Sequence, residues 1–314
     1  MDQADQDMIQ NSAVMHFISW LIVRSASVTT PVRPVFNASA KTPSGYSLND
    51  ILPKGTNNMN NLVEIMIRWS IKRFGYHTDV RKMYNSVALD KNFWRFQLYW
   101  WSESLGLNEE PKIKVIKTCI YGVKSSGNQA ERALRLVVQK LREKYPSAYD
   151  VVMRDVYVDD CISGEDTEEE REAATSQLHQ CLPHGGFMLK GFTFSGEDPN
   201  NDLSEDGISI MVGGLRYFPK GDFWMFNIDK LKEAKAKILI EKLTKRDCAS
   251  VSAHVFDLSG RAVPIIAGIK LDLSVLHKLG LEWDDLIPEN LREVWSDNLE
   301  MLESLGSANS DSAC

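Results

Sequence analysis

The 314-residue sequence has few cysteines, and they show no paired spacing. Its five cysteines are odd in number, and none of them forms a CxxC pattern. A disulfide framework uses an even number of cysteines, and a structural zinc site uses closely spaced ligands. The sequence therefore argues against both, and it indicates a reducing, intracellular and cytoplasmic location.

The sequence also has no long hydrophobic run. The longest apolar stretch near the start, residues 13–23, is interrupted by His16 and Ser19. It is shorter than the ~20 residues that cross a bilayer, and no secretory leader pattern precedes it. We therefore expect no membrane partner. With 43% hydrophobic and 25% charged residues, the chain is long enough for two or three subdomains with a sizeable core.

Net positive charge, which is common among nucleic-acid-binding proteins, is absent as well. The formal charge is −7, but residues 1–150 carry +7 and residues 151–314 carry −14. A chain can line one groove with basic residues while its other surfaces are acidic. The total therefore does not exclude a nucleic-acid partner, although an accidental asymmetry remains the alternative.

The most informative feature that is present is the pair Asp159-Asp160, which follows the apolar run Val156-Tyr157-Val158. Acids between two apolar segments are typical of a tight hairpin with the acids at its tip. Adjacent carboxylates repel each other unless a cation is nearby, and Mg²⁺ is usually held by one or two carboxylates together with substrate phosphates. The pair therefore indicates phosphoryl transfer, or alternatively a solvated acidic turn.

Hydrophobic periodicity predicts an α+β protein, with helices packed on one face of an antiparallel sheet. Strands are expected at 76–80, 93–100, 115–121, 187–194 and 208–215, and helices at 58–73, 129–144, 167–182, 250–256, 263–279 and 289–305. A basic helix is expected at 230–246. Thr167 and Glu170 form a capping-box pattern at the start of one of these helices.

A third acid, Asp79, lies at the end of the strand predicted at 76–80. If that strand pairs with the acidic hairpin, Asp79, Asp159 and Asp160 can hold two metal ions. Such a pair of ions activates a primer hydroxyl and stabilises the leaving pyrophosphate. A metal nuclease that uses the same acids is a weaker reading, because no His or Lys base is placed beside them by the sequence.

Several short motifs occur in the order seen in reverse transcriptases, and together they resemble the BEL/Pao class of long-terminal-repeat retrotransposons. The segments that carry the resemblance are 33–42, 47–50, 78–84, 121–126, 157–160, 185–190, 243–246, 255–260 and 280–285. The resemblance spans residues 28–305. It implies a right-hand polymerase, with an antiparallel-sheet palm, partial fingers and a mainly helical thumb or connection. The implied divisions are 1–75 for the fingers, 76–216 for the palm and 217–314 for the thumb with a mobile tail.

The resemblance also implies roles for single residues. Asp79, Asp159 and Asp160 correspond to the catalytic, metal-binding triad, with two Mg²⁺ ions, or Mn²⁺, as cofactors. Residues implied to bind the deoxynucleotide are Arg33, Tyr84, Tyr121, Gly122 and Ser126, with Tyr84 excluding a 2′-hydroxyl. Residues implied to bind nucleic acid are Lys190, Lys235, Lys242, Lys245 and Arg246. The alternatives are a core aromatic for Tyr84, a surface arginine for Arg33 and solvated lysines for the basic set.

The sequence departs from the family pattern at several positions. Asn37 stands where the family usually has Asp, Gly127 replaces a Pro, and 190–197 lacks the usual Trp and Ser-Asn pair. The implied function is an RNA-directed DNA polymerase acting on template-primer and deoxynucleotides. Protease, ribonuclease H and integrase domains are expected on the parent polyprotein, within a virus-like particle. The alternative is a decayed retrotransposon remnant that binds nucleic acid or a protein.

Overall fold

The computed structural model describes residues 14–24, 32–102, 110–201, 203–204, 206–258 and 260–307. The chain forms two compact units, Met1–Phe192 and Thr193–Cys314, which we describe separately. The boundary predicted at 216/217 therefore falls inside the second unit, and the tail from residue 308 onward lies outside the described residues. Within the described ranges, no helix is both long enough and apolar enough to span a bilayer.

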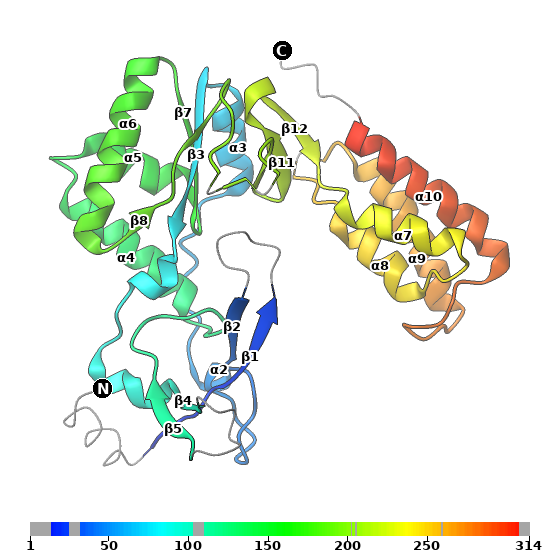
Figure 1. The fold of residues 1–314 in the computed structure, drawn as a ribbon, viewed down its shortest axis with the longest axis horizontal. Helices are drawn as coiled ribbons and strands as arrows, with labels where there is room; N and C mark the ends of the chain where they lie inside the picture. Colours follow the sequence, from blue (N-terminus) through cyan, green and yellow to red (C-terminus); the bar gives the residue numbers. More distant parts are fainter. Residues whose placement is uncertain are drawn as a thin grey trace. The chain divides into compact units, whose positions relative to one another are not determined.

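An antiparallel sheet organises the first unit (Figure 1). Its strands run in the order β6 (Val156–Tyr157), β7 (Asp160–Glu165), β3 (Phe74–Arg81) and β8 (Met188–Leu189). The register of β3 and β7 runs from Phe74↔Glu165 to Asp79↔Asp160. The predicted strand at 76–80 and the acidic hairpin are thus confirmed.

Four helices accompany this sheet: α3 (Leu62–Ser70), α4 (Ser126–Lys140), α5 (Pro146–Asp155) and α6 (Glu168–Cys181). Helices α4, α5 and α6 pack together beside the sheet (Figure 1). The predicted capping box of α6 is present, with Thr167 accepting from the Glu170 amide. Helix α5 was not predicted, although Pro146 occupies its first turn, a position that suits proline.

Smaller elements complete the first unit. One antiparallel pair consists of β1 (Ser19–Arg24) and β2 (Val32–Asn37), and it precedes α2 (Leu48–Ile51) in the sequence. A second antiparallel pair follows α2 and consists of β4 (Leu98–Trp101) and β5 (Lys112–Val115). The other elements are the 3-10 turns η1 (Met83–Ser86), η2 (Lys91–Phe96) and η3 (Leu182–Gly185).

Three strand predictions agree with the structure only in part. The range predicted as a strand at 93–100 begins as a 3-10 turn, in which Asp90 caps the Asn92 amide. The strand predicted at 115–121 lies earlier, at β5. The strand predicted at 187–194 is also interrupted, because only β8 and β9 (Thr193–Phe194) are extended within it.

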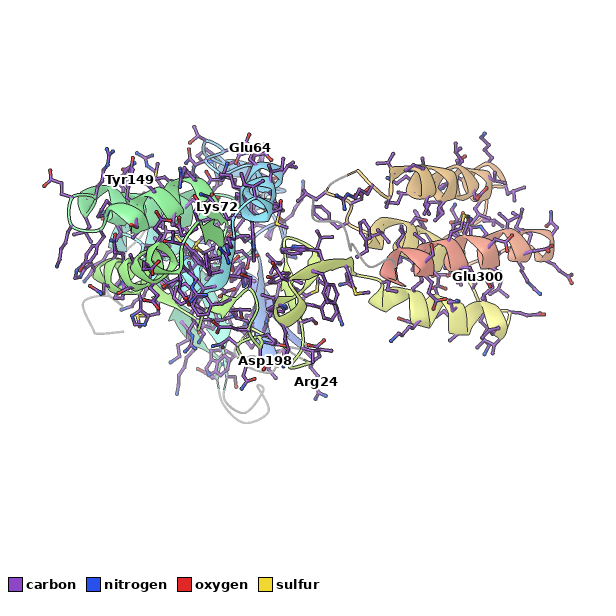
Figure 2. The ribbon with its side chains drawn as sticks, turned by 90° about the horizontal axis from the view of Figure 1, so that it is seen from above. Arg24, Glu64, Lys72, Tyr149, Asp198 and Glu300 are labelled. Atoms are coloured by element: carbon purple, nitrogen blue, oxygen red, sulfur yellow. The ribbon has the colours of Figure 1, made fainter. Side chains whose placement is uncertain are left out.

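The second unit combines three antiparallel strands, β10 (Ile210–Val212), β11 (Leu215–Phe218) and β12 (Phe223–Phe226), with four helices. The 3-10 turn η4 (Pro219–Gly221) connects β11 to β12, and the helices are α7 (Asp229–Leu239), α8 (Lys245–His254), α9 (Val263–Lys278) and α10 (Glu289–Ser307). Figure 2 shows these helices from above, with Glu300 labelled on α10. Their shared core includes Leu243, Ile269, Leu276 and Trp295.

The single basic helix predicted at 230–246 is wrong. Helix α7 ends at Leu239 and α8 begins at Lys245. Thr244 caps α8 by accepting from the Asp247 amide, and Asp247 bonds back to the Thr244 amide. This capping box starts a new helix where the charge pattern alone indicated a continuous one.

Candidate active site

Three carboxylates from two adjacent strands form the centre of the site. Asp79 on β3 is the register partner of Asp160 on β7, and the Val80 amide donates to the Asp159 carbonyl at 2.8 Å. Between the two strands of the hairpin, Val158 has a φ of 57°. A β-branched residue rarely adopts this left-handed conformation, and such strained positions cluster at functional sites.

The pKa values of Asp159 and Asp79 are raised at this centre. Burial, followed by the charges of Asp160 and Asp79, raises the pKa of Asp159 to about 6. Burial also raises the pKa of Asp79, where the Lys190 ammonium acts against it and the Asp160 charge acts with it. The raised pKa values agree with the expectation from the sequence that these adjacent carboxylates repel each other.

Two side chains within the unit already contact these acids. Lys190 Nζ lies 3.4 Å from Asp79 Oδ1, and the Lys190 amide donates to the Asp79 carbonyl at 2.9 Å. His77 Nε2 lies 3.1 Å from Asp160 Oδ1. Lys190 was predicted as a nucleic-acid-binding residue, and the structure places it against the acids. His77 was not predicted, although its position two residues before Asp79 on the same strand face could have indicated it.

The donor set suits a hard cation, but it is not arranged as a finished ion site. All three side chains offer carboxylate oxygens, which Mg²⁺ and Mn²⁺ prefer. Among the described residues, no group of three His, Cys, Asp or Glu side chains is already placed to hold an ion. The Asp79 carboxylate is turned toward Lys190, so ion binding would require it to reorient, whereas Asp160 contacts His77 through its Oδ1 atom.

Two tyrosines and an arginine lie beside the acids. The rings of Tyr84 and Tyr121 have centroids 4.3 Å apart and are tilted by 42°. Burial, then the Asp159 charge, raises the pKa of both phenols, that of Tyr121 to about 12, while the nearby Arg33 acts against the rise at Tyr121. The structure therefore brings together Arg33, both tyrosines and the acidic centre.

Gly122 and Ser126 occupy the segment that leads into α4. Gly122 has a φ of 94°, and a Cβ atom there would lie 2.4 Å from the Phe36 carbonyl oxygen of β2. Ser126 is buried in the first turn of α4, where its side chain forms a hydrogen bond with the side chain of Cys119. It also lines a largely apolar cavity of about 320 Å³ together with Leu48, Phe93 and Gln97.

The basic residues predicted in the second unit differ in their surroundings. The Lys235 ammonium pairs with Glu303, and Arg246 makes a two-pronged contact with Asp284 at 2.7 and 3.0 Å. Lys245 is buried and donates to the Leu281 carbonyl, with its ammonium 5.2 Å from the Trp283 ring. Lys242 is exposed on the turn between α7 and α8.

Comparison with solved structures shows a reverse-transcriptase fold. The chain matches the foamy viral protease-reverse transcriptase in complex with an RNA/DNA hybrid, with a TM-score of 0.59, 12% identity and coverage of 98% of this chain and 38% of that chain. It also matches the foamy viral protease-reverse transcriptase dRH in complex with double-stranded DNA, with a TM-score of 0.57, 14% identity and coverage of 96% and 45%. The chain thus spans less than half the length of either structure.

A family model described as the Pao retrotransposon-like RNaseH-like domain matches residues 244–308. The resemblance to the reverse transcriptases of BEL/Pao retrotransposons is therefore confirmed, by a Pao-like segment and a reverse-transcriptase fold. The matched segment is helical, comprising α8, α9 and α10; its described residues show one isolated strand pairing, Thr244↔Leu286. No sequence among the curated proteins matches the chain.

Proposed function

We propose that this chain is the polymerase domain of a reverse transcriptase, in which the sheet of the first unit serves as the palm. The reaction joins the primer O3′ to the α-phosphorus of a deoxynucleotide while the bond to the pyrophosphate oxygen breaks. The observation that carries the proposal is the meeting of Asp79, Asp159 and Asp160 on paired strands, where burial and mutual repulsion raise the pKa of Asp159 and Asp79.

In this proposal the three carboxylates hold two Mg²⁺ ions. When bound, these ions would supply activation of the primer hydroxyl and stabilisation of the leaving pyrophosphate. The chain's own contribution is to keep three oxygen-donor side chains on neighbouring strands of a stiff sheet. Val158, held in its left-handed conformation, turns the chain so that Asp159 and Asp160 are both close to Asp79.

The surrounding residues take the remaining roles. Tyr84, whose ring packs at a tilt against that of Tyr121, would lie under the sugar and exclude a 2′-hydroxyl. Arg33 would meet the triphosphate, because a planar guanidinium matches phosphate oxygens. Gly122, which leaves no room for a side chain beside Phe36, and Ser126 would border the nucleotide.

Lys190 is the cation closest to the acids, 3.4 Å from Asp79. In the proposed reaction its ammonium would move away from Asp79 and stabilise the charge that develops on the pyrophosphate. Helices α7 to α10 would form the thumb or connection. There the exposed Lys242 is better placed to meet a phosphate backbone than Lys245, which is buried.

The second candidate is a non-catalytic retrotransposon remnant that binds nucleic acid or a protein. The observation in its favour is that no ion site is preformed among the described residues, since Lys190 and His77 already engage two of the acids. Under this hypothesis the contacts of Lys190 with Asp79 and of His77 with Asp160 take the place of the ions.

Primer extension separates the two candidates. With a poly-rA template, an oligo-dT primer and Mg²⁺ or Mn²⁺, we expect the wild-type chain to incorporate deoxythymidylate. Asp159→Asn should abolish incorporation, because the Asn amide carries no charge to hold an ion. A matched control is Asp198→Asn, which removes an exposed carboxylate that pairs with Lys220 in the second unit. A wild-type chain without incorporation under either ion would favour the remnant.

A further inference from the structure

Within the acidic centre, the buried His77 makes one polar contact that neither the sequence motifs nor the fold comparison explains. Its residue exposure is 2%, and its Nε2 lies 3.1 Å from Asp160 Oδ1. Among the described residues, its other nitrogen, Nδ1, is buried without a hydrogen-bond partner. Burying a polar ring costs free energy unless its nitrogen atoms are hydrogen-bonded, so the contact with Asp160 offsets part of that cost.

The strand register explains why His77 reaches Asp160. His77 and Asp79 are two residues apart on β3 and share one face. Asp160 lies directly opposite Asp79, and Ile162 lies opposite His77. His77 is therefore the diagonal neighbour of Asp160, a separation that a long or aromatic side chain can bridge.

The geometry also defines what the contact does. A carboxylate oxygen can only accept, so Nε2 must be the nitrogen that donates its proton to Oδ1. The contact occupies one oxygen of Asp160 and leaves Oδ2 for another partner. With Nδ1 buried, the ring has no second polar group among the described residues that could pull it away from this carboxylate.

We propose that His77 is a positioning residue for ion binding: its Nε2–H fixes the Asp160 carboxylate so that Oδ2 faces Asp79 and Asp159. Carboxylates that bind metal ions are commonly held by such an outer hydrogen bond, and losing it typically costs 10–100-fold in metal affinity or activity. This inference rests on the proposed function, because it gives the three acids a divalent cation as their ligand.

Two substitutions of His77 test the inference, because both introduce a side-chain amide but place its nitrogen at different distances from the backbone. In His77→Gln the amide nitrogen can occupy the position of Nε2, whereas in His77→Asn it is one bond shorter and lies near Nδ1. Binding of Mn²⁺ to the full chain, followed by electron paramagnetic resonance, should weaken about tenfold in His77→Asn. It should stay within about threefold of the wild type in His77→Gln. A purely structural role for the ring would weaken both variants equally, and that result would overturn the inference.

A measurement on the wild-type chain covers the case in which the variants do not fold. Six histidines are present, and ¹⁵N labelling of histidine makes their ring nitrogens observable. Addition of Mg²⁺ should shift the Nε2 resonance of one buried histidine, since its carboxylate partner changes charge environment. If no buried histidine responds while Mn²⁺ binds, the inference is wrong.

The experiments distinguish failure of the His77 inference from failure of the proposed polymerase function. A chain that binds Mn²⁺ with the expected difference between the two variants, but that extends no primer, supports the role of His77 and argues against polymerase activity. A chain that extends primers while His77→Asn and His77→Gln show the same Mn²⁺ affinity retains its proposed function and loses the inference.

Discussion

At neutral pH and with no cation bound, the ionised Asp159 side chain lowers the stability of the folded chain. The pKa of Asp159 is about 6 in the folded chain because of burial and of the neighbouring Asp160 and Asp79, whereas an unfolded chain ionises aspartate near pH 4. A raised folded-state pKa means that the contribution of this group to stability is fully present below about pH 4 and is lost as the pH rises through about 6.

The first prediction follows from this difference. In EDTA, Asp159→Asn should be more stable than the wild type at pH 7.5, by at most about 3 kcal/mol and by less where solvent screens the charge. Near pH 4.5 the advantage should be largely gone. Denaturant unfolding at the two pH values measures it, and an advantage that does not depend on pH would contradict the origin of the effect.

Asp50 supplies a control of opposite sign. Hydrogen bonds from the backbone and side chain of Ser47 lower the pKa of Asp50, so its contribution to stability appears as the pH rises above its folded-state pKa. Asp50→Asn should therefore lose stability relative to the wild type as the pH rises toward the ordinary aspartate pKa of about 4, whereas Asp159→Asn gains it between about pH 4 and 6.

At the scale of helices and strands, the sequence predicted those features that depend only on residues close together in the chain. The capping box at Thr167 and the acidic hairpin depend on neighbouring residues, and both are present. Helix α5 was missed, because its short segment lies between a strong helix and a strong strand signal. The Lys237–Asp247 ion pair and the contact between Gly122 and Phe36 join distant residues, which no local pattern reports.

The Gly122 contact gives a prediction at this scale. Gly122→Ala places a Cβ atom 2.4 Å from the Phe36 carbonyl oxygen and must also adopt a φ of 94°. Gly45→Ala is the matched control, since Gly45 has a φ of 84° but nothing lies within 4 Å of its Cβ position. Thermal unfolding should show a loss of about 1 kcal/mol for Gly45→Ala and of about 2–4 kcal/mol for Gly122→Ala.

Equal losses in the two variants would mean that the close approach of β2 to the Gly122 segment does not hold in solution. Because Arg33 lies on the same strand as Phe36, we also expect Gly122→Ala to impair nucleotide use at temperatures where the variant remains folded. Gly45→Ala should extend primers as the wild type does.

For the whole molecule, the distribution of charge matters more than the total. A net charge of −7 repels a nucleic-acid backbone, yet residues 1–150 carry +7. Any affinity for template-primer must therefore come from local clusters of Lys and Arg that outweigh the acidic remainder at short range. Such binding releases counterions from the nucleic acid and weakens steeply as salt is added.

The fold supplies two lysines that test this argument in the full chain. Lys242 is exposed on the turn between α7 and α8, whereas the ammonium of Lys235 is paired with Glu303. The logarithm of the association constant should fall linearly with the logarithm of salt concentration, and Lys242→Gln should reduce that slope by about 1. Lys235→Gln should change the slope less, because its charge is already compensated. Fluorescence anisotropy of a labelled template-primer measures both slopes, and affinity that is insensitive to salt would show that the chain does not hold nucleic acid through its backbone.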